Sequence, residues 1–218
     1  MITYEMIKKD EDIRTYIKAA DDSLAALGYT EHNFPHVMKV AEDAAYILST
    51  LNYDEHTVEL ARIAGYMHDI GNLVNRVSHS QSGAIMAFRI LDKLGMPAED
   101  ISTVVTAIGN HDEGTGIAVS PVAAALILAD KCDVRRSRVR NSDLSSFDIH
   151  DRVNWSVKKA DMSVTEDKKL ILSLEIDSSI GPVMDYFEIF LDRMIMCRKA
   201  AETLALEFKL VINGNALL

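Results

Sequence analysis

The sequence predicts a mostly α-helical protein, a helical bundle followed by a small C-terminal α+β extension. Over roughly the first 150 residues, apolar side chains recur at three- and four-residue spacing, which is typical of amphipathic helices. Glycines and prolines fall between these segments, where helices end and begin. After about Asn154 the spacing changes to alternation, most clearly over residues 170–176. We therefore expect a helical domain over residues 1–150 and an α+β extension over 151–218.

Local signals place the helices of the first domain. The expected helices cover residues 4–27, 35–48, 55–69, 80–94, 98–110 and 121–129. Gly28 and Gly95 stop the first and fourth of them, and Asp54 is a good cap for the third. Gly71 fits the left-handed position after the third helix, so the pair His68-Asp69 is expected in its last turn.

The extension is expected to hold a short antiparallel sheet and one long helix. Residues 157–164 and 170–177 predict a hairpin across a charged turn, and 208–212 predict a third strand that ends at Asn213-Gly214. Between them, residues 182–206 predict the long helix. Its inward face is expected to carry Tyr186, Phe187, Phe190, Leu191, Met194 and Ile195. Any part of this apolar stripe left exposed would favour a homodimer.

Composition excludes several classes of function. The net charge of −10 argues against a nucleic-acid polymer as partner, and it requires local positive charge for any anionic substrate. Cys132 and Cys197 show neither metal-binding spacing nor a disulfide framework. The N-terminal segment is too charged for a secretory signal, and the longest strongly apolar run, residues 122–129, is too short to cross a membrane. The sequence therefore predicts a cytoplasmic protein.

Histidines and aspartates in apolar helical segments predict a metal site. These residues are His36, the adjacent pair His68 and Asp69, His79, His111 and Asp130. Buried imidazoles and carboxylates are costly without a partner, and together they are ligands for divalent first-row metals. Adjacent side chains point about 100° apart on a helix, so His68 and Asp69 can share one ion only if facing helices supply other ligands. His36 and Asp130, each near a helix end, are suited to do so.

Three sequence segments, taken in order, resemble the HD superfamily of metal-dependent phosphohydrolases. They are Pro35-His36-Val-Met-Lys-Val-Ala, Ala64-Gly-Tyr-Met-His-Asp-Ile-Gly and Ala125-Leu-Ile-Leu-Ala-Asp-Lys. The resemblance covers roughly residues 30–140 and implies an HD-type helical domain. It also implies that His36, His68, Asp69 and Asp130 hold one metal ion.

The resemblance leaves the number of ions open. Members with two further histidines, as here at His79 and His111, often hold two ions, and Asp69 would then be the bridging carboxylate. The cyclic-dinucleotide branch commonly has lysine where Asn72 stands, histidine where Asp112 stands, and a glycine-tyrosine-proline signature that is absent here. These departures argue against cleavage of cyclic dinucleotides. Mn²⁺ or Fe is the expected ion, with Mg²⁺, Ni²⁺ or Zn²⁺ as alternatives.

The function expected from these motifs is hydrolysis of a nucleotide or another small phosphate ester by a metal-activated water. His68 and Asp69 are the expected catalytic residues, with Asp69 also a candidate to accept the proton of the water. The residues expected to bind substrate are Asn72, Lys131, Arg135, Arg136 and Arg138, with Arg140 close by in the same basic cluster.

Other interpretations stay open at this point. His79 and His111 either bind metal, hydrogen-bond the substrate or lie exposed at helix ends, and Asn72 either contacts a ligand or caps its helix. The arginines either bind substrate or form ion pairs with Asp133, Asp143 and Asp148. His32, His56 and His150 match no motif and are assigned to the surface. The alternative functions are a dinuclear iron oxygenase on the same scaffold and an inactive, metal-stabilised sensor or interaction protein.

Overall fold

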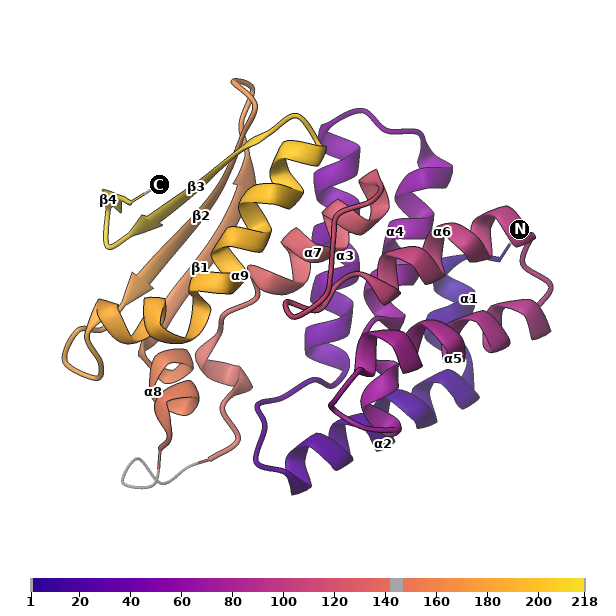
Figure 1. Cartoon of the computed structure of the whole chain (residues 1–218), viewed down its shortest axis with the longest axis horizontal. Helices are drawn as coiled ribbons and strands as arrows, with labels where there is room; N and C mark the ends of the chain where they lie inside the picture. The colour runs from indigo at the N-terminus through magenta and orange to yellow at the C-terminus, as the bar shows by residue number, and fades with distance from the viewer. Residues whose placement is uncertain (1, 142–146, 218) are drawn as a thin grey trace.

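A bundle of helices and a sheet backed by one long helix lie side by side along the long axis of the molecule (Figure 1). The computed structural model describes residues 2–141 and 147–217. The helices of the bundle are α1 (Tyr4–Lys9), α2 (Glu11–Ala26), α3 (Phe34–Thr50), α4 (Glu55–Met67), α5 (His79–Lys93), α6 (Ala98–Gly109) and α7 (Pro121–Lys131), with a short 3-10 helix η1 (Ile70–Leu73). The mostly helical architecture with a small sheet near the C-terminus confirms the predicted fold class.

Helix α7 lies at the centre of the bundle. Every residue from Val122 to Lys131 is buried, because α3, α4, α6 and α9 all pack against this helix. A helix enclosed on all sides is apolar around its whole circumference, which explains the strongly apolar run seen in the sequence. Ser120 caps it by accepting a hydrogen bond from the Ala123 amide at 3.1 Å. The central position of α7 brings its last residues to the middle of the molecule.

The sheet of the C-terminal part is mixed. Its strands are β1 (Val157–Val164), β2 (Lys169–Ile176), β3 (Glu207–Ile212) and β4 (Asn215–Ala216), in that spatial order. The β1–β2 and β3–β4 pairs are antiparallel, as in the predicted hairpin, but β2 and β3 are parallel. The expectation of a purely antiparallel sheet is therefore wrong. The long helix α9 (Val183–Thr203) carries the chain back to the end of the sheet where β2 begins, so β3 runs parallel to β2.

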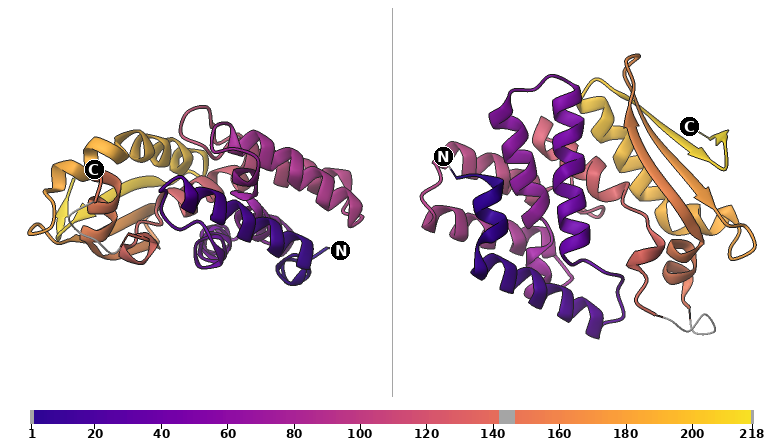
Figure 2. Two further views of the ribbon diagram at one scale, coloured as in Figure 1. Left: turned by 90° about the horizontal axis from the view of Figure 1, so that it is seen from below. Right: turned by 180° about the vertical axis from the view of Figure 1, so that it is seen from behind.

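Helix α9 lies between the sheet and the helical bundle (Figure 2). Tyr186, Phe190 and Met194 are buried, as predicted. Leu191 is 52% exposed, so its predicted inward position is wrong. The short elements η1, η2 (Arg136–Arg138) and β4 were not expected from the sequence, and neither was α8 (Ile149–Ser156), which runs across the predicted domain boundary.

Two local predictions in the helical domain need correction. The first expected helix is divided at Asp10, whose extended backbone ends α1 and whose carboxylate caps α2 through the Ile13 amide at 3.0 Å. Gly71 does not adopt the left-handed conformation but lies within η1. A Cβ atom there would lie 1.9 Å from the carbonyl oxygen of His79 and 2.4 Å from the amide nitrogen of Gly83. Glycine is needed at position 71 because α5 packs directly against its backbone.

Within the described ranges, no helix combines the length and the apolar character needed to span a lipid bilayer.

Candidate metal centre

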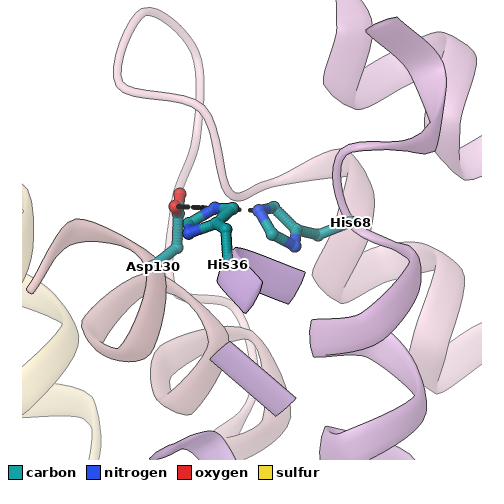
Figure 3. A group of neighbouring side chains, drawn as sticks. All are labelled: His36, His68 and Asp130. Atoms are coloured by element: carbon teal, nitrogen blue, oxygen red, sulfur yellow. Dashed lines mark ion pairs between the residues drawn. The ribbon is translucent and has the colours of Figure 1, made fainter. Parts of the chain in front are cut away.

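Helix ends from separate parts of the bundle bring the predicted ligands together. His36 lies in the first turn of α3, which Asn33 caps and Pro35 begins, and Asp130 lies in the last turn of α7. His68 and Asp69 follow directly after α4. Figure 3 shows the side chains of His36, His68 and Asp130 converging from three elements.

A glycine on α4 helps to bring two of these elements together. A Cβ atom on Gly65 would lie 2.7 Å from the Cα atom of Ala41, so α4 and α3 can approach this closely only with glycine at that position. The close approach occurs one turn before His68. It therefore fixes the distance between the two histidines that α3 and α4 contribute.

The first ligand cluster consists of His36, His68, Asp69 and Asp130, all buried. The Nε2 atom of His36 lies 3.5 Å from Oδ2 of Asp69 and 3.4 Å from Oδ1 of Asp130. The Nε2 atom of His68 lies 3.2 Å and 3.7 Å from the same two oxygens. Nε2 of each histidine thus lies within 3.7 Å of both oxygens. The donors of His36, His68 and Asp130 form one group close enough together to hold a divalent metal ion, and Asp69 joins His68 and His111 in an overlapping group.

Hydrogen bonds on the far side of each imidazole direct its Nε2 lone pair into the cluster. The Nδ1 atom of His36 donates to Oδ2 of Asp133 at 2.8 Å, and that of His68 donates to the carbonyl oxygen of Gly65 at 2.7 Å. Because both acceptors lack a proton, Nδ1 must carry it. The Nε2 atoms of His36 and His68 are buried and make no hydrogen bond within the described structure. Such unsatisfied buried nitrogens fit a bound metal ion.

A second cluster shares Asp69 with the first. Its members are Asp69, His79 and His111, and the two imidazole Nε2 atoms lie 3.5 Å and 3.9 Å from Oδ1 of Asp69. Their Nδ1 atoms face the carbonyl oxygens of Arg76 and Ile108 at 3.1 Å and 2.7 Å. The two Nε2 atoms therefore present lone pairs to each other at 3.1 Å. With both imidazoles neutral, a cation shared by these lone pairs would relieve their repulsion, so this cluster also fits an ion.

Each carboxylate oxygen of Asp69 faces a different cluster. Oδ2 faces His36 and His68, and Oδ1 faces His79 and His111. Asn72 holds the carboxylate in this orientation by donating to Oδ1 at 2.9 Å. The geometry is that of a carboxylate able to bridge two ions.

The clusters differ in the charge that they demand. Burial opposes a charge on His68, but the carboxylates of Asp69 and Asp130 outweigh it and raise the pKa of His68 to about 10. Burial also opposes ionisation of both aspartates, yet their cationic neighbours hold the pKa of each well below its usual range. Burial lowers the pKa of His79 and lowers that of His111 well below its usual value. The first cluster thus attracts a cation, and the second offers neutral imidazoles.

A cavity of about 400 Å³ opens onto both clusters. Asp69, His79, His111 and Asp130 lie in its wall, so the candidate ligands can be reached from outside. The volume lies within the range of small-molecule sites. Lining residues also come from α8 and α9, which means that the C-terminal part completes the cavity.

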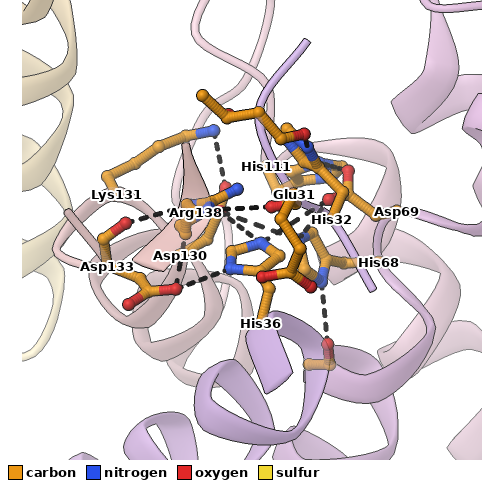
Figure 4. Close-up of polar contacts among 12 residues, drawn as sticks. Glu31, His32, His36, His68, Asp69, His111, Asp130, Lys131, Asp133 and Arg138 are labelled. Atoms are coloured by element: carbon orange, nitrogen blue, oxygen red, sulfur yellow. Dashed lines mark hydrogen bonds and ion pairs between the residues drawn. The ribbon is translucent and has the colours of Figure 1, made fainter. Parts of the chain in front are cut away.

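The predicted substrate residues divide into two groups. Lys131 and Arg138 line the cavity, where Lys131 lies 2.6 Å from Asp130 (Figure 4). Arg135 and Arg136 do not line it. Arg135 instead binds both carboxylate oxygens of Asp133, and Arg136 stacks on the ring of Trp155.

The other residues singled out in the sequence also have definite positions. Asn72 lies behind Asp69 rather than in the cavity wall, and Arg140 pairs with Asp21. His56 pairs with Asp100 at 2.7 Å, as a surface residue can. Asp143 lies outside the described residues.

Several residues of the site were missed from the sequence. His32, assigned to the surface, is half-buried in the cavity wall and packs edge-on against His36 with ring centroids 5.5 Å apart. His150 also lies in the wall. Arg76 and Arg193 line the same cavity, and Asp133 orients His36. Asp133 was expected as an ion-pair partner of the arginines, as it is for Arg135, whereas its contact with His36 was not predicted.

The part of the chain that carries these residues matches a known family model. Residues 33–135, which contain every candidate ligand, match the family model described as HD domain. Over 202 residues the chain is 24% identical to an uncharacterized protein of Methanocaldococcus jannaschii, MJ1020, covering 82% of this chain and 77% of that protein. A crystal structure of a predicted HD superfamily hydrolase from an uncultured Thermotogales bacterium is 25% identical and covers 62% of this chain and 75% of that one, with a TM-score of 0.43.

Proposed function

We propose that this chain, which belongs to the HD superfamily through residues 33–135, is a metal-dependent phosphohydrolase that cleaves a nucleotide or another small phosphate ester. The observation that carries the proposal is the pair of ligand clusters that share Asp69 at the wall of a cavity. A purely structural ion would be enclosed by protein ligands, whereas these ligands can be reached from the cavity.

The residues present fit one or two divalent ions. His36, His68, Asp69 and Asp130 would hold the first ion, and Asp69, His79 and His111 would hold the second. A bound ion supplies a water of lowered pKa and neutralises charge on phosphoryl oxygens. Mn²⁺ or Fe suits this mixture of imidazole and carboxylate, with Mg²⁺, Ni²⁺ and Zn²⁺ as alternatives.

The side chains of this protein have distinct tasks in such a reaction. Asp69 orients the site and, as the carboxylate between the clusters, is placed to accept a proton from the attacking water. Lys131 neutralises Asp130 and presents an ammonium group at the cavity wall. Arg138 is buried and fixed by the backbone oxygens of Glu31 and Asp133, so it presents a rigid positive charge to the same cavity.

Charge in the cavity favours a phosphorylated substrate. Four basic side chains of this acidic chain line the cavity, Arg76, Lys131, Arg138 and Arg193, and they balance four aspartates in the same wall, Asp69, Asp130, Asp148 and Asp151. With the charge of a bound ion, they make a local site for an anion despite the overall net charge. The enclosed shape and the small volume favour a small molecule over a nucleic-acid polymer. We place this activity in the cytoplasm.

A metal-supplemented hydrolysis screen tests the proposal. The protein is stripped of metal, reloaded with each ion in turn, and assayed for phosphate release from mononucleotides, dinucleoside polyphosphates, alarmones, cyclic dinucleotides and p-nitrophenyl phosphate. Asp69→Ala should abolish metal-dependent release while circular dichroism shows the helices intact. Asp112→Asn is the matched control, because this nearby acid lies 3.9 Å from Nε2 of His79 and belongs to neither cluster.

The same screen tests the alternative chemistry. Four histidines and two aspartates around two adjacent points would also suit a dinuclear iron oxygenase. Oxygen uptake by the iron-loaded protein, with no phosphate release from any ester, would favour that function and refute the phosphohydrolase.

A further inference from the structure

We propose that Arg76 binds the terminal phosphoryl group of the substrate and makes the cavity selective for phosphomonoesters over phosphodiesters. This inference rests on the proposed phosphohydrolase function and specifies its substrate class. Arg76 lies in the loop between η1 and α5, within the cavity wall.

Three of the four basic side chains in the cavity wall already lie close to a carboxylate. Lys131 lies 2.6 Å from Asp130, Arg138 lies 3.7 Å from Asp133, and Arg193 lies 2.8 Å from Glu113. Each of these charges is already opposed by a carboxylate. Among the residues that the structure describes, Arg76 has no carboxylate within ion-pair distance. Its charge is therefore the one that an incoming anion can use most fully.

Three side chains lie beside the guanidinium group of Arg76. Its Nη1 atom lies 3.4 Å from Oδ1 of Asn72 and 3.4 Å from Nε2 of His79. The group also packs over the ring of Tyr29, with its central carbon 5.5 Å from the ring centroid. Arg76 is thus held at the edge of the second cluster, although its three neighbours leave its positive charge unopposed.

Asn72 links this guanidinium group to the shared carboxylate. The amide oxygen of Asn72 faces Arg76, and its amide nitrogen donates to Oδ1 of Asp69 at 2.9 Å. The position of Arg76 is therefore tied to that of the candidate bridging ligand. A cation bound beside His79 would repel the guanidinium group, so an anion placed between the two would be stabilised by both.

The number of phosphoryl oxygens gives the selectivity. A phosphomonoester has three oxygens that are not part of the ester bond and carries close to two negative charges at neutral pH, whereas a diester has two such oxygens and one charge. Ions held by the clusters would engage some of these oxygens. An arginine beside the clusters suits the additional oxygen and charge that only the monoester offers. Arg76 should therefore stabilise monoesters more than diesters.

The experiment compares Arg76→Ala and Arg76→Lys with Arg89→Ala, which removes an exposed arginine from α5. The reloaded enzymes are assayed with p-nitrophenyl phosphate and bis(p-nitrophenyl) phosphate. Binding of inorganic phosphate is measured by calorimetry, and metal content by elemental analysis. Loss of one charge-assisted interaction should lower kcat/KM for the monoester roughly 10- to 100-fold, and that for the diester by about 3-fold or less. Phosphate affinity should fall in parallel, with lysine restoring part of it and metal content unchanged.

Three results would overturn the inference: equal losses for both esters, unchanged phosphate affinity in Arg76→Ala, or a loss of metal equal to the loss of activity. The last would show that Arg76 supports the metal centre and not the substrate. Failure of the proposed function looks different, because the wild-type protein would then release phosphate from neither ester under any metal. Arg76-dependent binding of inorganic phosphate by such an inactive protein would still support an anion site at Arg76.

Discussion

Asp133 offers a direct test of the metal centre without altering a ligand. Its Oδ2 atom accepts the Nδ1 proton of His36 at 2.8 Å, and Arg135 binds both of its oxygens at 2.6 Å and 3.0 Å. The carboxylate is fully buried. Burial opposes its charge, but His36 and Arg138 outweigh this and lower the pKa of Asp133. Asp133→Asn keeps the size of the side chain and removes the charge that orients the imidazole.

The expected magnitude follows from the role of such partners. Asparagine has only one acceptor oxygen, so it cannot serve both His36 and Arg135 as the carboxylate does. One of the two contacts must then face an amide NH₂ group. Loss of an outer partner of a ligating histidine typically lowers metal affinity about 10- to 100-fold, which is about 1.4 to 2.8 kcal/mol. We expect this loss of metal affinity at the first cluster, which contains His36, and a smaller loss at the second cluster.

The assay is competition for Mn²⁺ with a chelator, read out by elemental analysis, alongside thermal unfolding by circular dichroism. Asp43→Asn is the matched control, because Asp43 lies on the same helix as His36 and pairs with Lys39 at 2.7 Å. Unchanged affinity in Asp133→Asn would refute the argument that this carboxylate orients His36 toward an ion. An equal loss in Asp43→Asn would show that general destabilisation of α3 is responsible.

Three further predictions concern packing and charge. Gly71→Ala should lower the free energy of unfolding by about 1 to 3 kcal/mol in chemical denaturation, because the new methyl group would meet backbone atoms of α5. Metal content should also fall, because His79 would shift. Wild-type stability of this variant would contradict the prediction. Glu113, whose pKa falls to about 2 because its cationic neighbours outweigh burial, should contribute up to about 3 kcal/mol above pH 4.5. That stability should be lost as pH falls from 4.5 toward 2, and Glu113→Gln should remove this slope from pH-dependent unfolding curves. Metal binding near pH 8 should release a proton from His68, because the pKa of this imidazole is about 10 without metal. The metal-binding enthalpy should therefore differ between buffers of different ionisation enthalpy. Identical enthalpies would contradict the release of a proton.

Local sequence signals predicted the helices that carry the ligands. Capping residues and prolines are local signals, because each marks a helix start only a few residues away, as Asp54 does for α4 and Ser120-Pro121 do for α7. They indicated where α4 and α7 begin, whereas Gly71 after His68 and the end of the apolar run before Asp130 indicated that these two residues lie near helix C-termini. The convergence of these ends could be expected only because one ion requires ligands from several elements.

Contacts between distant segments could not be predicted in the same way. Gly71 was expected to adopt the left-handed conformation common after a helix. Glycine is instead required there because the backbone of α5 packs against it. Arg135 and Arg136 follow the last ligand closely in sequence, but neither lines the cavity. Arg193, 63 positions after Asp130 by the numbering, does line it. Proximity along the chain is thus a poor guide to which cations face a cavity built from several elements.

The parallel pairing of β2 with β3 follows from the same limit. Alternation identified the strands, but their direction depends on the path of α9, which the sequence pattern does not specify. That path has a consequence for the site, because it carries Phe190 and Arg193 along the helical bundle to the cavity. Arg193 binds Glu113, which also lies 3.5 Å from Lys131 beside the candidate metal ligand Asp130. The C-terminal part is therefore joined to the candidate centre by a continuous series of charges. Residues 33–135, which match the HD domain model, carry the candidate ligands, whereas residues beyond position 135 complete the wall of the cavity.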